Sequence, residues 1–345
     1  MIKFDESVDI SGMRANLESF PDQVRVSWET GIKIGSETKK APPGFLIWAG
    51  MGGSAIGGDF CAVLANESAA MPIMVHRGGP LPAWVKKDHH ILLVSYSGNT
   101  AETLNVAQQA VERGCGFDAM TSGGRIGEWI QEQGNTPWIV PGGMPPRAAF
   151  GHLFACSYAV LTGRGWCQTQ DGDIAETRTI LDRSAEELKE PPVNNSTQLG
   201  SLVHGLLDKL PMIYGTGKFV PVARRWACQF NENAKIPAHW GELPEMNHNE
   251  VVAYRNGSQW GNKCSVIILE DPNSPEDVRL RVDVTLKLAR EAGWDGWIIR
   301  PKAKHPIAGM LEMTMLGDWL SYWLAIAQGV DPTPIPTIDR LKAAL

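Results

Sequence analysis

The sequence predicts an α/β protein with two parallel β-sheets, each flanked by helices on both faces. Three observations lead to this prediction. Short apolar runs alternate with longer segments of helical periodicity, as in β-α-β units. Glycine-rich turns follow several of these apolar runs. The alternation is interrupted once, over residues 168–195, where a charged segment of helical pattern ends in PPVNNS.

The first half contains five apolar runs bounded by glycine, proline or polar turns, and each is short enough to be a buried strand. The expected strands are 44–50, 71–78, 90–98, 115–124 and 136–143. The segments between and after them have helical patterns. The expected helices are 55–65, 100–113, 126–133 and 147–163. This half is predicted to be one domain, residues 1–167.

Residues 168–195 are expected to form a helical connection, after which the alternation resumes. The expected strands of this second half are 211–217, 263–271 and 294–301, and its helices are 220–233, 274–293 and 306–328. A proline-punctuated tether and a short helix close the chain. Residues 196–345 are therefore predicted to be a second domain with the C-terminal helix. The strand-and-glycine-turn segments LIWAGMGGSAIGGDF and MIYGTGKFVPVARRW are weakly alike, which favours two copies of one unit.

Length and charge agree with this organisation. The chain has 345 residues, and about 150 residues per domain suggests roughly two domains. The formal net charge of −6 argues against a general nucleic-acid binder, which would present a basic face. An anionic small molecule remains compatible with this charge, because a pocket needs only a few cations or backbone N–H groups.

The compartment expected from the sequence is the cytoplasm. The N-terminus MIKFDESVDI lacks the apolar region of a secretory signal. The longest strongly apolar cluster, residues 319–327, is far shorter than the roughly 20 residues of a membrane span, so no membrane partner is expected. None of the six cysteines forms a CxxC pair, which indicates reduced thiols.

A glycine-rich segment, GMGGSAIGGD at residues 50–59, follows the first strand and opens a helix. Such a turn exposes N–H groups and the positive end of the helix dipole to an anion. Gly50, Gly52 and Ala55 also fit a dinucleotide-binding pattern. The second strand ends in His76 and Arg77 rather than in an acidic residue, so an NADP enzyme is one alternative, with Arg77 on the 2′-phosphate. A tight turn without any ligand is the other.

The segment SYSGNTAETL, residues 95–104, favours a phosphate site. Asn99 and Glu102 have capping-box spacing, which predicts that a helix starts here. Capping leaves three hydroxyls at the end of the strand unexplained, those of Ser95, Ser97 and Thr100. Hydroxyl and N–H donors at a helix start are what a phosphate monoester needs, and adjacent strand ends in a parallel sheet share one crevice.

Five segments together resemble one family across nearly the whole chain. They are GMGGSAIGGD, SYSGNTAET, PPRAAFG, NENAKIPAHWGELPEMNHNE and the C-terminal IDRLKAAL. They resemble the bifunctional phosphoglucose/phosphomannose isomerases, which are built from two SIS (sugar isomerase) domains. The resemblance implies a metal-free aldose–ketose isomerase that interconverts glucose 6-phosphate, and mannose 6-phosphate, with fructose 6-phosphate through a cis-enediol.

The resemblance also implies roles for particular residues. Glu232 in NENAK corresponds to the base that moves a proton between C1 and C2, which suits a carboxylate. His248 in MNHNE corresponds to the acid/base that opens the sugar ring, and Lys342 to a lysine that assists it. Arg147 in PPRAAF corresponds to the cation that stabilises the enediolate.

For the phosphate group, the resemblance implies six residues from the two loops: Gly52, Gly53, Ser54, Ser95, Ser97 and Thr100. His248 is expected to reach the site of a neighbouring subunit, so a homodimer is implied. A threonine near the C-terminal lysine, Thr333 or Thr337, is expected to help the site accept both epimers.

No cofactor and no metal are expected. His239, Glu242, Glu245 and His248 recur every three residues, but Gly241 and Pro244 interrupt any helix that would place them on one face. Two alternatives to the isomerase remain: a non-catalytic SIS module that senses a sugar phosphate, and an NADP-dependent oxidoreductase. The sequence also leaves open an amino-sugar phosphate as the substrate.

Overall fold

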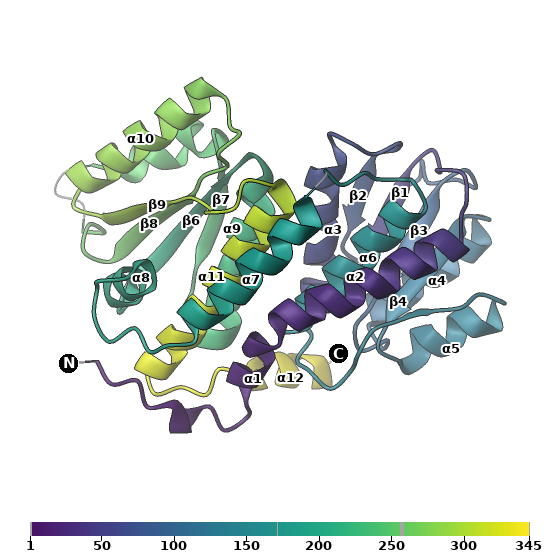
Figure 1. Cartoon of the computed structure of the whole chain (residues 1–345), viewed down its shortest axis with the longest axis horizontal. Coiled ribbons are helices and arrows are strands. Elements are labelled where there is room, and N and C mark those ends of the chain that lie inside the picture. The colour runs from purple at the N-terminus through teal and green to yellow at the C-terminus, as the bar shows by residue number, and fades with distance from the viewer. Residues whose placement is uncertain (1, 171, 256–258, 345) are drawn as a thin grey trace. The chain divides into compact units, whose positions relative to one another are not determined.

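The computed structural model describes residues 2–170, 172–255 and 259–344. It divides into two compact units (Figure 1). The N-terminal unit is Ser19–Asp173, and the C-terminal unit combines Met1–Glu18 with Ile174–Leu345. The division differs from the expected ranges, because residues 1–18 and most of the segment expected to be a connection, from residue 174 onward, group with the C-terminal unit. That segment forms helix α7 (Asp173–Leu188), and Trp323 Nε1 donates to the carbonyl of Leu188 at 2.9 Å.

The sheet of the N-terminal unit has five parallel strands in the order β2-β1-β3-β4-β5. The strands are β1 (Leu46–Ala49), β2 (Ile73–His76), β3 (His90–Val94), β4 (Gly116–Thr121) and β5 (Trp138–Ile139). All five expected strands are present. β2 and β3, the strands that follow β1 in the chain, pair with opposite sides of β1. The strand order therefore reverses at β1, and in open parallel sheets ligands bind at the carboxyl ends of the strands at such a point.

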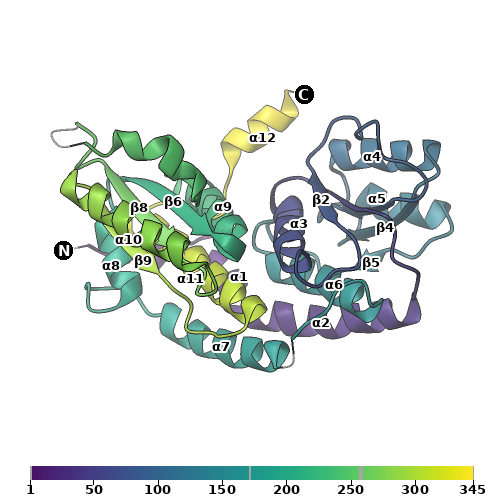
Figure 2. The ribbon, with the colours of Figure 1, turned by 90° about the horizontal axis from the view of Figure 1, so that it is seen from above.

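Helices cover both faces of this sheet, as predicted. They are α2 (Phe20–Glu37), α3 (Gly52–Ala65), α4 (Ala101–Glu112), α5 (Gly124–Glu132) and α6 (Phe150–Gly163). Figure 2 shows α4 and α5 on one side of the strands and α2 and α6 on the other. Side chains alternate along β1 accordingly. Ile47 packs in the cluster under α4 and α5, whereas Trp48 lies against Gly58 of α3.

Helices α2 and α6 run side by side because glycines remove the side chains between them (Figure 1). A Cβ at Gly31 would lie 2.4 Å from the carbonyl oxygen of Cys156, and one at Gly35 would lie 2.5 Å from that of Val160. Both distances are far below van der Waals contact. Only glycine permits this approach, so these two positions fix the spacing of the helix pair.

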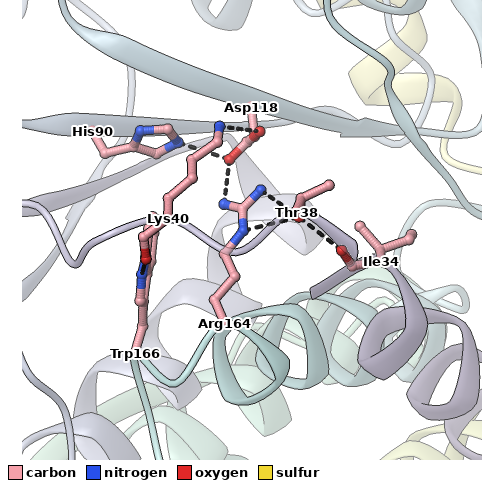
Figure 3. Close-up of polar contacts among 7 residues, drawn as sticks. All are labelled: Ile34, Thr38, Lys40, His90, Asp118, Arg164 and Trp166. Carbon is pink, nitrogen blue, oxygen red and sulfur yellow. Dashed lines mark hydrogen bonds and ion pairs between the residues drawn. The ribbon is translucent and has the colours of Figure 1, made fainter. Parts of the chain in front are cut away.

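A buried polar cluster ties this helix pair to the amino-terminal side of the sheet (Figure 3). Asp118 of β4 receives Arg164 Nη1 at 2.5 Å and lies 2.7 Å from Nε2 of His90 in β3. Arg164 also donates through Nη2 to the hydroxyl of Thr38 at 3.0 Å, and Lys40 Nζ lies 3.5 Å from the carboxylate. The cluster therefore joins two strands to the ends of α2 and α6.

The surroundings of the cluster favour its charged form. The Arg164 guanidinium lies between Trp138 and Trp166, 5.1 and 5.0 Å from their ring centroids. Burial by itself raises the pKa of Asp118, but hydrogen bonds from His90 and Arg164 outweigh it and hold that pKa well below its usual range.

The sheet of the C-terminal unit has four parallel strands in the order β7-β6-β8-β9. They are β6 (Leu210–Thr216), β7 (His239–Leu243), β8 (Cys264–Leu269) and β9 (Asp295–Ile299). The helices of this unit are α1 (Met13–Glu18), α7, α8 (Gln198–Leu206), α9 (Val220–Gln229), α10 (Glu276–Glu291), α11 (Pro306–Ala327) and α12 (Pro336–Ala343). The prediction of an α/β fold with two parallel sheets is confirmed, but strand β7 was not expected from the sequence.

Helix α11 is the centre of the C-terminal unit. Every residue from Ile307 to Ile326 is buried, including the charged Asp318. The Asp318 carboxylate receives Arg225 Nη2 at 2.7 Å and Gln229 Nε2 at 2.8 Å, both from α9. Because two donors satisfy this buried charge, α9 is held in one register on α11.

The two sheets share a turn after their central strands. Gly52 after β1 has a φ of +48°, and Gly217 after β6 has a φ of +49°. In the C-terminal unit an internal carboxylate lies over this turn, because Asp271 Oδ2 accepts from the N–H of Lys218 at 3.2 Å. Asp271 is 4% exposed, and its own N–H donates to the hydroxyl of Thr216 at 2.8 Å. A side chain therefore fills this second turn.

No helix in the described ranges has both the length and the apolar composition to span a bilayer.

Replacing Asp118 with alanine is predicted to destabilise the chain by about 3–5 kcal/mol, because the buried Arg164 guanidinium would lose its counter-charge. Urea unfolding at pH 7 measures this loss. Since the folded pKa of Asp118 is lower than the unfolded value of 3.8, its contribution is present above about pH 4 and disappears as the pH falls further. The stability difference between wild type and Asp118→Ala should therefore shrink in acid. Equal stabilities at pH 7 would contradict the prediction.

Candidate active site

In the N-terminal unit, the predicted phosphate residues lie in the loops that follow β1 and β3. Helix α3 begins at Gly52 directly after β1, and within the described chain no side chain caps its first turn. The loop approaches β3 closely, since a Cβ at Gly50 would lie 2.9 Å from the carbonyl oxygen of Val94. The N–H groups at the start of α3 are thus arranged to face an anion.

The hydroxyls predicted to bind phosphate lie in these two loops. Ser54 Oγ accepts from the N–H of Tyr96 at 3.2 Å, which joins the two loops. The hydroxyls of Ser95 and Thr100 are 2.9 Å apart, and Ser97 Oγ accepts from the N–H of Asn99 at 3.3 Å. Ser54 and Ser95 are buried, whereas Ser97 and Gly52 are exposed. The structure therefore brings the six predicted phosphate residues, Gly52, Gly53, Ser54, Ser95, Ser97 and Thr100, into two connected loops.

The predicted capping box at Asn99 and Glu102 is wrong. Helix α4 begins at Ala101 with Thr100 at its N-cap, so Asn99 lies one residue too early to cap it. The Asn99 side chain instead accepts from the N–H of Arg125 in the first turn of α5, at 3.1 Å. It therefore ties the phosphate loop to a second helix start.

Arg147 lies beside the glycine loop. It is 4% exposed, and a Cβ at Gly53 would lie 3.1 Å from the carbonyl oxygen of Pro146 and 3.4 Å from the Cα of Arg147. Glycine at position 53 is what lets the two segments touch. The structure thus places the predicted cation next to the predicted phosphate loop.

Tyr96 is a residue that sequence reasoning missed. Its hydroxyl donates to the carbonyl of Pro141 at 3.0 Å and accepts from the N–H of Met144 at 3.2 Å. These bonds fix the segment that leads to Arg147 onto the phosphate loop. The signal in the sequence was a large aromatic residue inside an otherwise small and polar turn, SYSGNT.

In the C-terminal unit, the first predicted site residue is Glu232, which lies in a turn. Residues Phe230–Ala234 form a π-helical turn at the end of α9, and Glu232 is partly buried within it. Single π turns inside helices occur frequently at functional sites. Asn233 Nδ2 donates to Ser321 Oγ at 2.9 Å, and Gln328 Nε2 donates to the carbonyl of Ala234 at 3.2 Å. Helix α11 therefore fixes the backbone on which Glu232 stands.

His248 ends a short 3-10 helix, Glu245–His248, that follows β7, and its side chain is exposed. The neighbouring residues anchor this loop. Asn247 Nδ2 donates to Thr285 Oγ1 of α10 at 2.8 Å, and Glu250 receives the hydroxyl of Tyr214 at 2.7 Å. The histidine is therefore presented at the surface by a fixed loop.

Lys342 lies on α12, and all described residues of this helix from Asp339 onward are exposed. The tether before it is anchored, since Ser11 Oγ donates to Asp331 Oδ2 at 2.9 Å and the N–H of Thr333 donates to Asp331 Oδ1 at 3.0 Å. Thr337 is exposed on the first turn of α12. Lys342 and Glu232 thus belong to the same unit.

Two alternative interpretations lose support. The Arg77 guanidinium forms an ion pair with Asp59 of α3, so it already has an anionic partner where NADP would need a free cation. His239 lies in strand β7, whereas His248 lies in a separate 3-10 turn, so their regular spacing does not place them on one helix face. Among the described residues no cluster of three His, Cys, Asp or Glu side chains has the geometry of a metal site.

Comparison with known proteins agrees with this geometry. Residues 194–345 match the model of the bacterial phospho-glucose isomerase C-terminal SIS domain. The chain is 31% identical over 334 residues to a bifunctional phosphoglucose/phosphomannose isomerase of Caldicellulosiruptor bescii, covering 96% of this chain and 98% of that relative. The chain belongs to this family. It is an isomerase, and a second relative of the same description, from Aquifex aeolicus, is 33% identical over 87% of this chain and 90% of its own length.

One curated relative has a different description. A D-glucosamine-6-phosphate 4-epimerase of Sulfolobus acidocaldarius is 31% identical over 86% of this chain and 88% of its own length. Among solved structures, the C-terminal domain of glucosamine-fructose-6-phosphate aminotransferase from Francisella tularensis superposes with a TM-score of 0.68. It is 16% identical and is matched over 93% of this chain and 98% of its own, which shows a shared fold.

Replacing Tyr96 with phenylalanine is predicted to weaken binding of inorganic phosphate and to lower stability by about 1 kcal/mol, since the N–H of Met144 loses its acceptor. Isothermal calorimetry and thermal unfolding measure the two effects. Tyr322→Phe, in the C-terminal unit, is the matched control for stability, because it also loses a hydroxyl hydrogen bond, the one to Glu6, and it should leave phosphate binding unchanged. Phosphate affinity unaltered by Tyr96→Phe would contradict the positioning role of this hydroxyl.

Proposed function

We propose that this isomerase interconverts glucose 6-phosphate, and also mannose 6-phosphate, with fructose 6-phosphate through a cis-enediol. The observation that carries the proposal is the pair of connected hydroxyl-rich loops of the N-terminal unit, with the backbone of Arg147 packed against the glycine loop. Membership of the bifunctional phosphoglucose/phosphomannose isomerase family supports the choice of substrates.

The phosphate is held by Ser54, Ser95, Ser97 and Thr100 and by the N–H groups of Gly52 and Gly53. Hydroxyl and N–H donors at the start of a helix compensate the phosphate charge without a basic surface. This explains how a chain of net charge −6 accepts an anionic substrate.

Glu232 transfers the proton. Its carboxylate removes the C2 proton of the open-chain aldose, and the C1 carbonyl oxygen becomes the enediolate oxygen. O1 then gains a proton while the C2 hydroxyl loses one. Glu232 returns its proton to C1, so that C2 becomes the carbonyl carbon of the ketose. The Arg147 guanidinium stabilises the negative charge that develops on the enediolate oxygens. Both epimers pass through the same enediol, so one base serves both. Thr333 or Thr337 would help the open chain rotate about C2–C3.

His248 and Lys342 open the sugar ring. One group protonates the ring oxygen while the other takes the proton of the anomeric hydroxyl, which breaks the ring C–O bond and forms the carbonyl. The exposure of His248 supports its use in the site of a second copy of the chain, within a homodimer. Neither step needs a metal or a cofactor. The cytoplasm, where sugar phosphates are metabolised, is the proposed compartment.

A second candidate substrate class is an amino-sugar phosphate. The D-glucosamine-6-phosphate 4-epimerase among the relatives motivates it. A 4-epimerase acts on C4 of its sugar, so the two candidates differ in the carbon of the sugar that changes.

The experiment that tests the function is incubation of fructose 6-phosphate with the protein in the presence of EDTA, followed by separate assays for glucose 6-phosphate and mannose 6-phosphate. We expect both products. No product, together with epimerisation of glucosamine 6-phosphate, would favour the second candidate. Activity that EDTA abolishes and zinc restores would contradict the metal-free mechanism.

Glu232→Gln is predicted to lower kcat by roughly 10²- to 10⁴-fold, because the amide cannot accept the proton. Deuterium incorporation at C2 of glucose 6-phosphate in deuterated water should stop, while phosphate binding persists. Glu245→Gln, an exposed glutamate of the same unit, is the matched control and should exchange at the wild-type rate. Retained exchange in Glu232→Gln would mean that another residue is the base.

Mixing two inactive variants tests the contribution of His248 across subunits. If His248 serves the partner's site, a hybrid of Glu232→Gln and His248→Gln chains has one intact site. Random mixing should then restore roughly a quarter of the wild-type sites, because about half of the dimers are hybrids. The readout is isomerase activity after the two variants are unfolded and refolded together. No recovery, with hybrid dimers verified by native mass spectrometry, would place His248 in the site of its own chain.

A further inference from the structure

Lys235, the last residue of NENAK, has an unusual backbone and two unusual contacts. Its φ is +57° and its ψ is 28°, the left-handed conformation that glycine adopts more readily than residues with a side chain. Its N–H donates to the carbonyl of Phe230 and closes the π turn. The backbone conformation at position 235 favours glycine, so the lysine found there indicates that its side chain has a role.

The Lys235 ammonium joins two segments that are far apart in the sequence. Nζ donates to the main-chain carbonyl of Glu232 and, at 3.0 Å, to the carbonyl of Pro332. Pro332 belongs to the tether that leads to α12, the helix of Lys342. The Lys235 ammonium therefore links the main-chain carbonyls of Glu232 and Pro332, which both belong to the C-terminal unit.

A charged donor suits these two carbonyls. A π turn at a helix end leaves carbonyl groups without the regular i→i+4 partners, and lysine side chains commonly bond the last carbonyls of a helix. Proline has no N–H and cannot extend a backbone ladder from the tether to the turn. An ammonium offers three donors, and hydrogen bonds from a charged donor are stronger than neutral ones.

We propose that Lys235 is a positioning residue that locks the turn of Glu232 to the tether of Lys342, so that the base and the ring-opening lysine are held as one block. The proposal rests on the proposed function for the roles of Glu232 and Lys342. Lys235 does not touch the reacting atoms. It acts through the carbonyls of Glu232 and Pro332, and its loss leaves both side chains present but displaced.

The test compares Lys235→Met, which keeps the length of the side chain and removes its donors, with Lys235→Arg, which keeps a charged donor. Lys287→Met on α10 is the matched control, because Lys287 is exposed and its nearest acid, Glu291, is 3.8 Å away. Isomerisation of fructose 6-phosphate gives kcat and KM, and hydrogen exchange read by mass spectrometry follows peptides covering 230–236 and 330–343.

We expect kcat of Lys235→Met to fall about 10²-fold, since small displacements of catalytic groups cost this much. KM should change less than about twofold, because the phosphate residues belong to the other unit. Both peptides should exchange faster in Lys235→Met, whereas Lys287→Met should match wild type. Lys235→Arg should recover most of kcat and of the protection.

Three results would overturn the proposal: a wild-type kcat in Lys235→Met, faster exchange in only one of the two peptides, or no recovery with arginine. If Lys235→Met does not fold, Lys235→Gln, which keeps a neutral donor, takes its place with the same criteria. A wild-type chain inactive on hexose phosphates would refute the proposed function, yet hydrogen exchange would still decide whether Lys235 joins the two segments.

Discussion

The hydrogen-bond geometry of a parallel sheet constrains this protein more than any single contact. All strands end at the same edge, and the central strand is joined to a neighbour on each side, so loops diverge there and leave a crevice. In the N-terminal unit these loops begin helices, and their N–H groups face the crevice. The phosphate residues and the segment of Arg147 gather at this edge because every strand delivers its following loop to the same place.

The C-terminal unit has a parallel sheet of its own, and there a buried helix supports the candidate residue Glu232. Its central helix, α11, contributes Asp318 and Ser321, which hold the end of α9 and the π turn that follows. Glu232 is therefore fixed from behind by a buried helix. Rigid support of this kind matters for the proton transfer proposed for Glu232, because a carboxylate displaced by an ångström from the substrate carbon loses most of its effect.

The fold class, the five strands of the first sheet and the positions of the two glycine- and serine-rich loops after β1 and β3 could be predicted, since each depends on residues adjacent in the sequence. Strand β7 could not be predicted from the sequence. HWGEL lacks an apolar run and pairs only with β6 at the edge of the sheet. The grouping of residues 1–18 with the C-terminal unit also depends on distant partners, such as the bond from the Tyr322 hydroxyl to Glu6. Tyr96 and Lys235 escaped notice because their contacts cross many residues.

The carboxylate of Asp271 makes the two similar turns, at Gly52 and Gly217, chemically different. It lies over a turn like that of Gly52 and fills it from within the chain. A ligand that is covalently attached has no translational freedom to lose, so its effective concentration stays far above that of any free anion. The turn at Gly217 thus keeps a carboxylate of the chain itself within hydrogen-bonding distance, whereas a Cβ at Gly52 would meet no atom within 4 Å. The same backbone turn is therefore closed from within in one unit and open in the other.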